Sequence, residues 1–176
     1  LSIRRDVDGV STCMLERLAG YNLLVQNDAF FVDSGTSFSG SATTTFGGLW
    51  HLEGETVVAL CDGVVVRDRV VTNGTLTVPV ASIRCSVGRP YVADLETLPI
   101  AFNTAGGGMG MLKNPTEVNL RVFKSNGIWV GHNFSSLFEY KPEVAGTYST
   151  PEPLISAEIN MPMPRKHMAM TASRAV

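Results

Sequence analysis

Two pairs of carboxylates have a spacing that could support acid–base chemistry. Glu53 and Glu55 are two residues apart, and so are Asp94 and Glu96. Residues two apart in a β-strand lie on the same face, so each pair could bind Ca²⁺ or serve as the acid and base of a hydrolase. The same spacing is also typical of a solvated strand edge or turn, which is the interpretation we favour.

The other reactive side chains are scattered along the chain. The three histidines fit no metal-binding spacing, and the three cysteines form no CxxC pair, so we expect neither a zinc site nor a disulfide framework. Cys61 and Cys85 fall on apolar strand faces and are interpreted as small buried hydrophobes. No GxSxG or P-loop motif is present, and we therefore expect no enzymatic activity, no cofactor and no metal. The histidines are His51, His132 and His167, and the cysteines are Cys13, Cys61 and Cys85.

Composition excludes several further classes. The chain has 176 residues, of which 44% are hydrophobic and only 17% charged, and its formal charge is 14 − 16 = −2. The apolar content is too high for a disordered chain, and no apolar run is long enough for a transmembrane helix. Without a basic excess, tight nucleic-acid binding is not expected. Because the chain begins with Leu1 inside structured-looking sequence, we expect a piece of a longer polypeptide.

Turn dipeptides between apolar runs predict an all-β fold. Asp62-Gly63 separates TVVALC from VVVRDRVV, and Asn73-Gly74 precedes TLTVPV. Asn126-Gly127 lies between the alternating run 117–124 and Ile-Trp-Val, which predicts a third hairpin. Residues 13–26 allow either a weak helix or a strand over 11–18 that is entered through Asp8-Gly9, and we favour the strand.

The alternation of apolar residues also predicts the core and the connections. The segment 33–48 is expected to be an ordered connection that contains a short strand, and 103–114 a mobile glycine-rich loop. In 82–87, residues 83, 85 and 87 are expected on one face. The predicted core consists of Val57, Ala59, Val64, Val66, Val71, Leu76, Val78, Ile83, Cys85 and Val87.

Four strings occur in an order and at a spacing that is similar to a family of bacteriophage tail proteins. They are DAFFVDSG at 28–35, GLWHLEGETVVALCDG at 48–63, SVGRPYVADLETLP at 86–99 and VNLRVFKSNGIWVG at 118–131. Together they resemble the nozzle or tail-tubular proteins of tailed phages, over about residues 14–131. The chain departs from that pattern in its glycine-rich loop, which keeps only Lys113 of a basic stretch, and after Gly131, where the similarity fades.

The resemblance implies a fold and a division of the chain. It implies a small antiparallel β-barrel-like module flanked by strands of a larger, propeller-like β structure. The segments would be a flanking hairpin and connection at 1–48, the barrel-like module at 49–101, a glycine-rich loop at 102–116, and a flanking hairpin with an extended C-terminal segment at 117–176.

The resemblance also implies a function without catalysis. Such proteins form a ring, generally sixfold, around the channel through which DNA leaves the capsid. The expected partners are further copies of the chain, other tail and portal-adaptor proteins, and DNA in transit without specific binding. No membrane insertion is expected, and the protein would reside in the virion after assembly in the bacterial cytoplasm. The candidate channel or inter-subunit loop consists of Gly106, Gly107, Gly108, Met109 and Gly110.

Two other functions fit parts of the sequence. A receptor- or glycan-binding β-module would use exposed aromatic side chains as stacking platforms. A cell-wall hydrolase would need two of the paired carboxylates to converge in a cleft at roughly 5–10 Å. The candidate platforms are Trp50, Tyr91, Trp129 and Tyr140.

Overall fold

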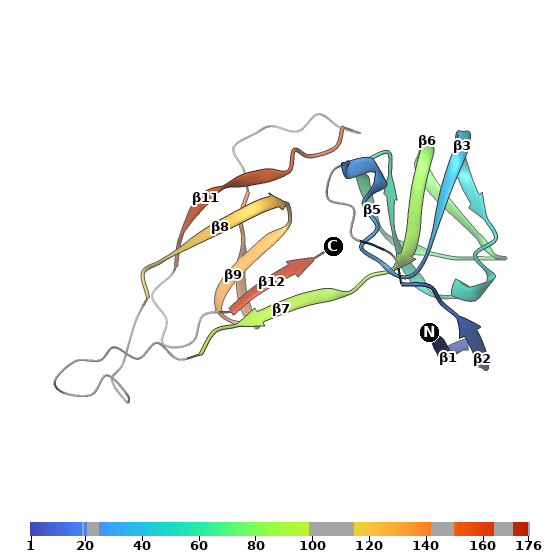
Figure 1. The fold of residues 1–176 in the computed structure, drawn as a ribbon, viewed down its shortest axis with the longest axis horizontal. Helices are drawn as coiled ribbons and strands as arrows, with labels where there is room; N and C mark the ends of the chain where they lie inside the picture. Colours follow the sequence, from blue (N-terminus) through green and yellow to red (C-terminus); the bar gives the residue numbers. More distant parts are fainter. Residues whose placement is uncertain (19, 21–24, 99–114, 142–149, 164–170, 176) are drawn as a thin grey trace. The chain divides into compact units, whose positions relative to one another are not determined.

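The computed structural model has an all-β fold, as the sequence predicts (Figure 1). It describes residues 1–18, 20, 25–98, 115–141, 150–163 and 171–175. Within these ranges the only helical elements are two short 3-10 turns, and no helix has the length and apolar character of a transmembrane span. The chain divides into two compact units, Leu1–Tyr91 with Ala145–Glu152, and Val92–Val144 with Pro153–Val176.

The first unit contains a hairpin and a four-stranded antiparallel sheet. The hairpin pairs β1 with β2, and the sheet has the order β3-β6-β4-β5. The 3-10 turns η1 and η2 precede β3 and β4. The elements are β1 (Ser2–Val7), β2 (Val10–Leu15), η1 (Gln26–Asp28), β3 (Asp33–Gly47), η2 (Trp50–Leu52), β4 (Thr56–Cys61), β5 (Val64–Val70) and β6 (Thr75–Arg89).

The second unit contains two sheets. One has the order β10-β9-β12-β7, and the other pairs β11 with β8. Apolar residues from β8, β9 and β11 form one buried cluster, so both sheets contribute to the same core. The strands are β7 (Val92–Glu96), β8 (Glu117–Ser125), β9 (Ile128–Asn133), β10 (Ser136–Glu139), β11 (Ile155–Pro162) and β12 (Thr171–Ala175).

Three Asx-Gly dipeptides form tight turns in the first unit. Both residues of Asp8-Gly9, Asp62-Gly63 and Asn73-Gly74 have positive φ, as a type I′ turn requires. Asp62-Gly63 joins β4 to β5, which pair directly. Asn73-Gly74 is closed by reciprocal backbone hydrogen bonds between Thr72 and Thr75, at 3.0 and 3.1 Å. Beyond that bridge, β5 pairs with β4 and not with β6.

The prediction of a hairpin at Asn126-Gly127 is wrong, although the chain turns there. β8 pairs with β11, and β9 pairs with β10 and β12, so the two strands joined by this turn lie in different sheets. Only Gly127 of the dipeptide has positive φ, and Lys124 at the end of β8 also adopts φ 44°. The backbone therefore leaves the β8 sheet before the dipeptide and does not fold back along the same strand.

The first-unit core matches the predicted one except at its margins. Seven of the ten predicted residues lie in the buried cluster, and Val66 packs against it. Ile83 is instead 55% exposed. Leu76 and Val78 face inward at even positions of β6 while Cys85 and Val87 do so at odd ones, because the β3–β6 register shifts between them. The cluster also contains Cys61, which is expected to be a buried hydrophobe, and three residues absent from the predicted core, Phe46, Leu49 and Leu52.

Two further expectations about organisation differ from the structure. Residues 33–47 form one strand of 15 residues instead of a connection with a short strand. Since β3 pairs with β6 along most of its length, the expected boundary after residue 48 falls inside a sheet. That sheet runs from β3 to β5 without closing into a barrel in the part of the chain that the structure describes. The loop 106–110 lies outside the described residues.

Candidate functional site

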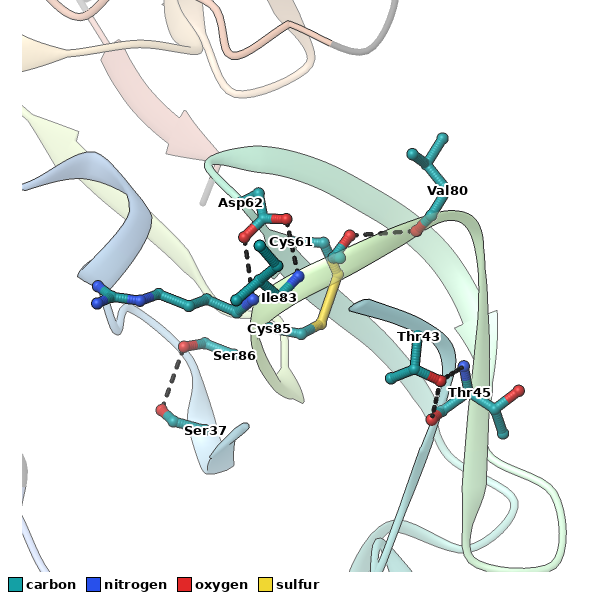
Figure 2. Close-up of a disulfide and its surroundings, with 11 residues drawn as sticks. Ser37, Thr43, Thr45, Cys61, Asp62, Val80, Ile83, Cys85 and Ser86 are labelled. Carbon is teal, nitrogen blue, oxygen red and sulfur yellow. Dashed lines mark hydrogen bonds between the residues drawn. A yellow bond between two sulfur atoms is a disulfide. The ribbon is translucent and has the colours of Figure 1, made fainter. Parts of the chain in front are cut away.

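The turn between β4 and β5 is anchored to β6 by the carboxylate of Asp62 (Figure 2). Its Oδ2 accepts a hydrogen bond from the backbone N–H of Ile83 and its Oδ1 one from that of Arg84, both at 2.9 Å. The backbone N–H of Asp62 donates to the carbonyl of Arg84 at 2.8 Å. The side chain that starts the turn therefore also fixes the register of the neighbouring strand.

A disulfide joins the two strands beside this anchor. Cys61 and Cys85 are directly paired across β4 and β6, with Cα atoms 4.2 Å apart, and are linked through their sulfur atoms (Figure 2). Both are buried, at 4% and 1% exposure, as expected for small hydrophobes. The expectation of no disulfide framework is thus wrong for this one pair, because the register that places two distant cysteines opposite each other is set by long-range pairing. Cys13 is a free, exposed thiol.

A second carboxylate holds the next turn. Oε1 of Glu53 accepts a hydrogen bond from the backbone N–H of Asn73 at 2.8 Å, and Oε2 accepts one from that of Gly74 at 2.6 Å. Both oxygens of this carboxylate thus bind successive amides of one type I′ turn. Glu53 follows η2, which positions its side chain next to the turn.

Trp50 lies against the same turn. A Cβ placed on Gly74 would be 2.6 Å from both Cδ2 and Cε2 of the indole, so the ring packs directly on the glycine backbone. The side chains of Leu49 and Leu52 anchor this segment in the core, whereas Trp50 itself is 65% exposed. The result is an indole that is held by its contact with Gly74 and is open to solvent elsewhere.

The candidate acid–base pairs do not form a catalytic arrangement. Glu53 is engaged by the turn amides, and Glu55 forms an ion pair with Arg89 at 3.5 Å. Asp94 and Glu96 are exposed on β7 in the second unit. Among the described residues, no group of three or more His, Cys, Asp and Glu side chains could hold a metal ion.

A polar cluster at the base of the first hairpin was not predicted from the sequence. Arg5 Nη2 donates to Asp33 Oδ1 at 3.0 Å, and Arg5 Nε donates to Glu16 Oε1 at 3.2 Å. Ser34, which adopts φ 52°, donates from Oγ to the same Glu16 oxygen at 2.6 Å. The hydrogen bond from Ser34, followed by that from Arg5, lowers the pKa of the Glu16 carboxyl, although burial acts in the opposite direction. The cluster connects the β1–β2 hairpin to the start of β3.

The histidines have unrelated environments. Nε2 of His51 lies 2.9 Å from the carbonyl oxygen of Ser34, and since a carbonyl can only accept, this nitrogen carries the proton. His132 is buried in β9 of the second unit. His167 lies outside the described residues. The structure therefore brings no two of the described histidines into one arrangement with the carboxylates considered above.

The aromatic side chains differ in exposure. Trp50 and Tyr91 are exposed, whereas Trp129 and Tyr140 are partly buried, and Tyr140 packs against the second-unit core. Of these four side chains, Trp50 is exposed and also packs on the backbone of the turn residue Gly74. The arrangement as a whole consists of structural clamps and one exposed indole. Comparison with known proteins gives no match for this chain, neither to a family model nor to a curated protein sequence.

Proposed function

We propose that the chain is a structural subunit of a bacteriophage tail, a nozzle or tail-tube component that forms a ring around the DNA-ejection channel. The support comes from the string 48–63, which resembles that family. Its two most prominent acidic residues, Glu53 and Asp62, each bind two consecutive backbone amides. Carboxylates used in this way position strands and are not available for acid–base chemistry, so the string fits a scaffold better than an enzyme.

The charge of the chain supports the same proposal. A channel must let DNA pass without holding it, and each neutralised phosphate would add affinity through counterion release. A formal charge of −2 with 17% charged residues avoids such binding. Identical subunits would use heterologous contacts that close by rotation, giving a ring, generally sixfold, that joins other tail and portal-adaptor proteins in the virion after assembly in the host cytoplasm.

Electron microscopy of virions tests this proposal directly. Fab fragments raised against the purified chain are expected to decorate a ring on the tail axis, and the purified full-length protein is expected to form rings of the same diameter. Fab fragments raised against an unrelated protein of similar mass serve as the control. Virions without Fab density on the axis, together with a protein that stays monomeric at high concentration, would contradict the proposal.

A second candidate, a glycan-binding module, is favoured by the exposure of Trp50. Sugar rings stack on exposed aromatic faces, and the indole of Trp50 is 65% exposed while being held against Gly74. Titration with bacterial cell-surface oligosaccharides is expected to quench tryptophan fluorescence in wild type and in Trp129→Phe. Trp50→Phe should lose most of the binding. Equal binding by both variants, or none by the wild type, would exclude Trp50 as a sugar platform.

A further inference from the structure

The paired cysteines of β4 and β6 lie in a strand register that is also supported by backbone pairing and by Asp62. Cys61 and Cys85 face each other directly, and the pairs on the same ladder continue to Val58 and Gly88. The next residue after Cys61 is Asp62, whose carboxylate and N–H together make three hydrogen bonds to the residues just before Cys85. Backbone pairing and the Asp62 clamp therefore support the register that places the two sulfur atoms next to each other, in addition to the bond between them.

The surroundings of the pair suit both oxidation states. Both side chains belong to the apolar cluster of the first unit, and their burial is nearly complete. Free cysteines are among the most buried residue types and pack as small hydrophobes with weak S–H donors. Breaking the sulfur–sulfur bond would thus leave no unsatisfied strong polar group in this core.

We propose that Cys61 and Cys85 form a redox staple: a preorganised dithiol in a reducing compartment that becomes a disulfide in an oxidising one, with the same fold in both states. The inference stands on the chain itself and does not depend on the proposed tail function. Cytosolic proteins keep their thiols reduced, whereas extracellular ones retain disulfides, so one chain that passes from the first compartment to the second would be stabilised only after the transfer.

The oxidation balances with a small-molecule disulfide as the oxidant. One cysteine thiolate attacks a sulfur of oxidised glutathione and displaces one glutathione thiolate, which forms a mixed disulfide. The second cysteine thiolate then attacks the protein sulfur of that mixed disulfide and displaces the second glutathione. Two cysteine sulfurs are oxidised, one glutathione disulfide is reduced to two thiols, and the protons lost by the cysteines pass to the leaving thiolates. Access to the buried pair requires local opening at the end of β4.

Thiol counting on the full-length protein tests the staple. Protein purified in reductant is expected to have three titratable thiols under denaturing conditions, and protein treated with oxidised glutathione only one. The two forms are expected to give the same near-ultraviolet circular dichroism. The disulfide closes a loop across 24 residues, so Tm is expected to rise by about 10 °C on oxidation.

Three variants separate the alternatives. Cys13→Ser should keep the full Tm increase, because the exposed thiol is not involved, whereas Cys61→Ala combined with Cys85→Ala should abolish it. Asp62→Asn keeps one of the two acceptor oxygens and is expected to oxidise several-fold more slowly than wild type. A reduced wild-type protein without native near-ultraviolet signal would overturn the proposal, and so would an oxidised protein that retains three thiols or gains no thermal stability.

Discussion

The carboxylate of Glu53 accepts a hydrogen bond from the backbone N–H of Gly74 at 2.6 Å. Its other oxygen accepts one from the backbone N–H of Asn73. A single side chain therefore satisfies two consecutive amides of the turn. The indole of Trp50 packs on the same glycine. The turn thus depends on one electrostatic and one steric partner, and each can be removed separately.

Glu53→Gln is expected to destabilise the first unit. The amide keeps one acceptor oxygen but loses the negative charge, and hydrogen bonds to charged groups contribute about 1.5–3 kcal/mol, so we expect a loss of about 1–2 kcal/mol. The midpoint of urea unfolding at unchanged m-value measures it. Glu96→Gln, on exposed β7, is the matched control and should stay within about 0.5 kcal/mol of wild type. Equal midpoints for both variants would show that the Glu53 clamp contributes nothing.

Gly74→Val is expected to be more damaging. Gly74 adopts φ 63°, and a Cβ there would also collide with the Trp50 ring. Positive φ alone costs a β-branched residue about 1–2 kcal/mol, so we expect a total loss of at least about 2 kcal/mol. Gly40→Val is the control, because Gly40 has no atom within 4 Å of its Cβ position. Combining Gly74→Val with Trp50→Ala should recover the steric part of the loss, and an unchanged unfolding midpoint for Gly74→Val would contradict the turn.

The sequence predicted local turn chemistry better than strand pairing. Asp62-Gly63 and Asn73-Gly74 could be predicted because Asp, Asn and Gly adopt positive φ more readily than other residues do. Asn126-Gly127 carries the same signal, yet its flanking strands belong to different sheets. Which strand pairs with which is decided by the burial of distant segments, such as β11 on β8, and no short window of sequence contains that information.

The sequence indicates which residues belong to the candidate site, but not which partners they contact. The spacing of Glu53 and Glu55 indicates a carboxylate pair, but the amides that bind Glu53 lie 20 and 21 residues further along the chain. Alternation places Cys61 and Cys85 correctly on apolar faces, but their pairing depends on the long-range register of β4 against β6, which no short segment of sequence contains. A face can be predicted from alternation, but a bulge that changes which residues face inward cannot.

Asp62 should be more sensitive to replacement by alanine than by asparagine. Alanine removes both oxygens that accept hydrogen bonds from the Ile83 and Arg84 amides. It also tolerates the φ of 49° at this position less well than Asp or Asn does. We expect a loss of about 2–4 kcal/mol for Asp62→Ala, and about 1 kcal/mol for Asp62→Asn, which tolerates this φ and keeps one acceptor. Urea unfolding of the reduced protein measures both without the disulfide, and Asp94→Asn serves as the exposed control. Equal losses for the two Asp62 variants would refute the bidentate clamp.

Acid should weaken the docking of the first hairpin. The pKa of Glu16 is lowered in the folded state, first by the hydrogen bond from Ser34. A depressed folded-state pKa means that the stabilisation is fully present above the unfolded value of about 4.3 and is lost as pH falls through the folded pKa. Urea unfolding between pH 7 and pH 3 should therefore show a steeper loss for wild type than for Glu16→Gln. Parallel pH profiles would mean that the Glu16 cluster does not contribute.

Gly131 is expected to be indispensable for the pairing of β9 with β10. A Cβ at this position would lie 1.9 Å from the carbonyl oxygen of Ser136, which is backbone and cannot rotate away. Gly131→Ala should therefore separate the strands, at a cost of about 3 kcal/mol from overpacking. Hydrogen–deuterium exchange of peptides covering 128–139 is the measurement, because it reports on the second unit alone, and these amides should exchange at least tenfold faster. Gly47→Ala, whose Cβ would meet Thr75 at an ordinary 3.9 Å, is the control. Unchanged protection over 128–139 in Gly131→Ala would show that β9 and β10 are not packed this closely.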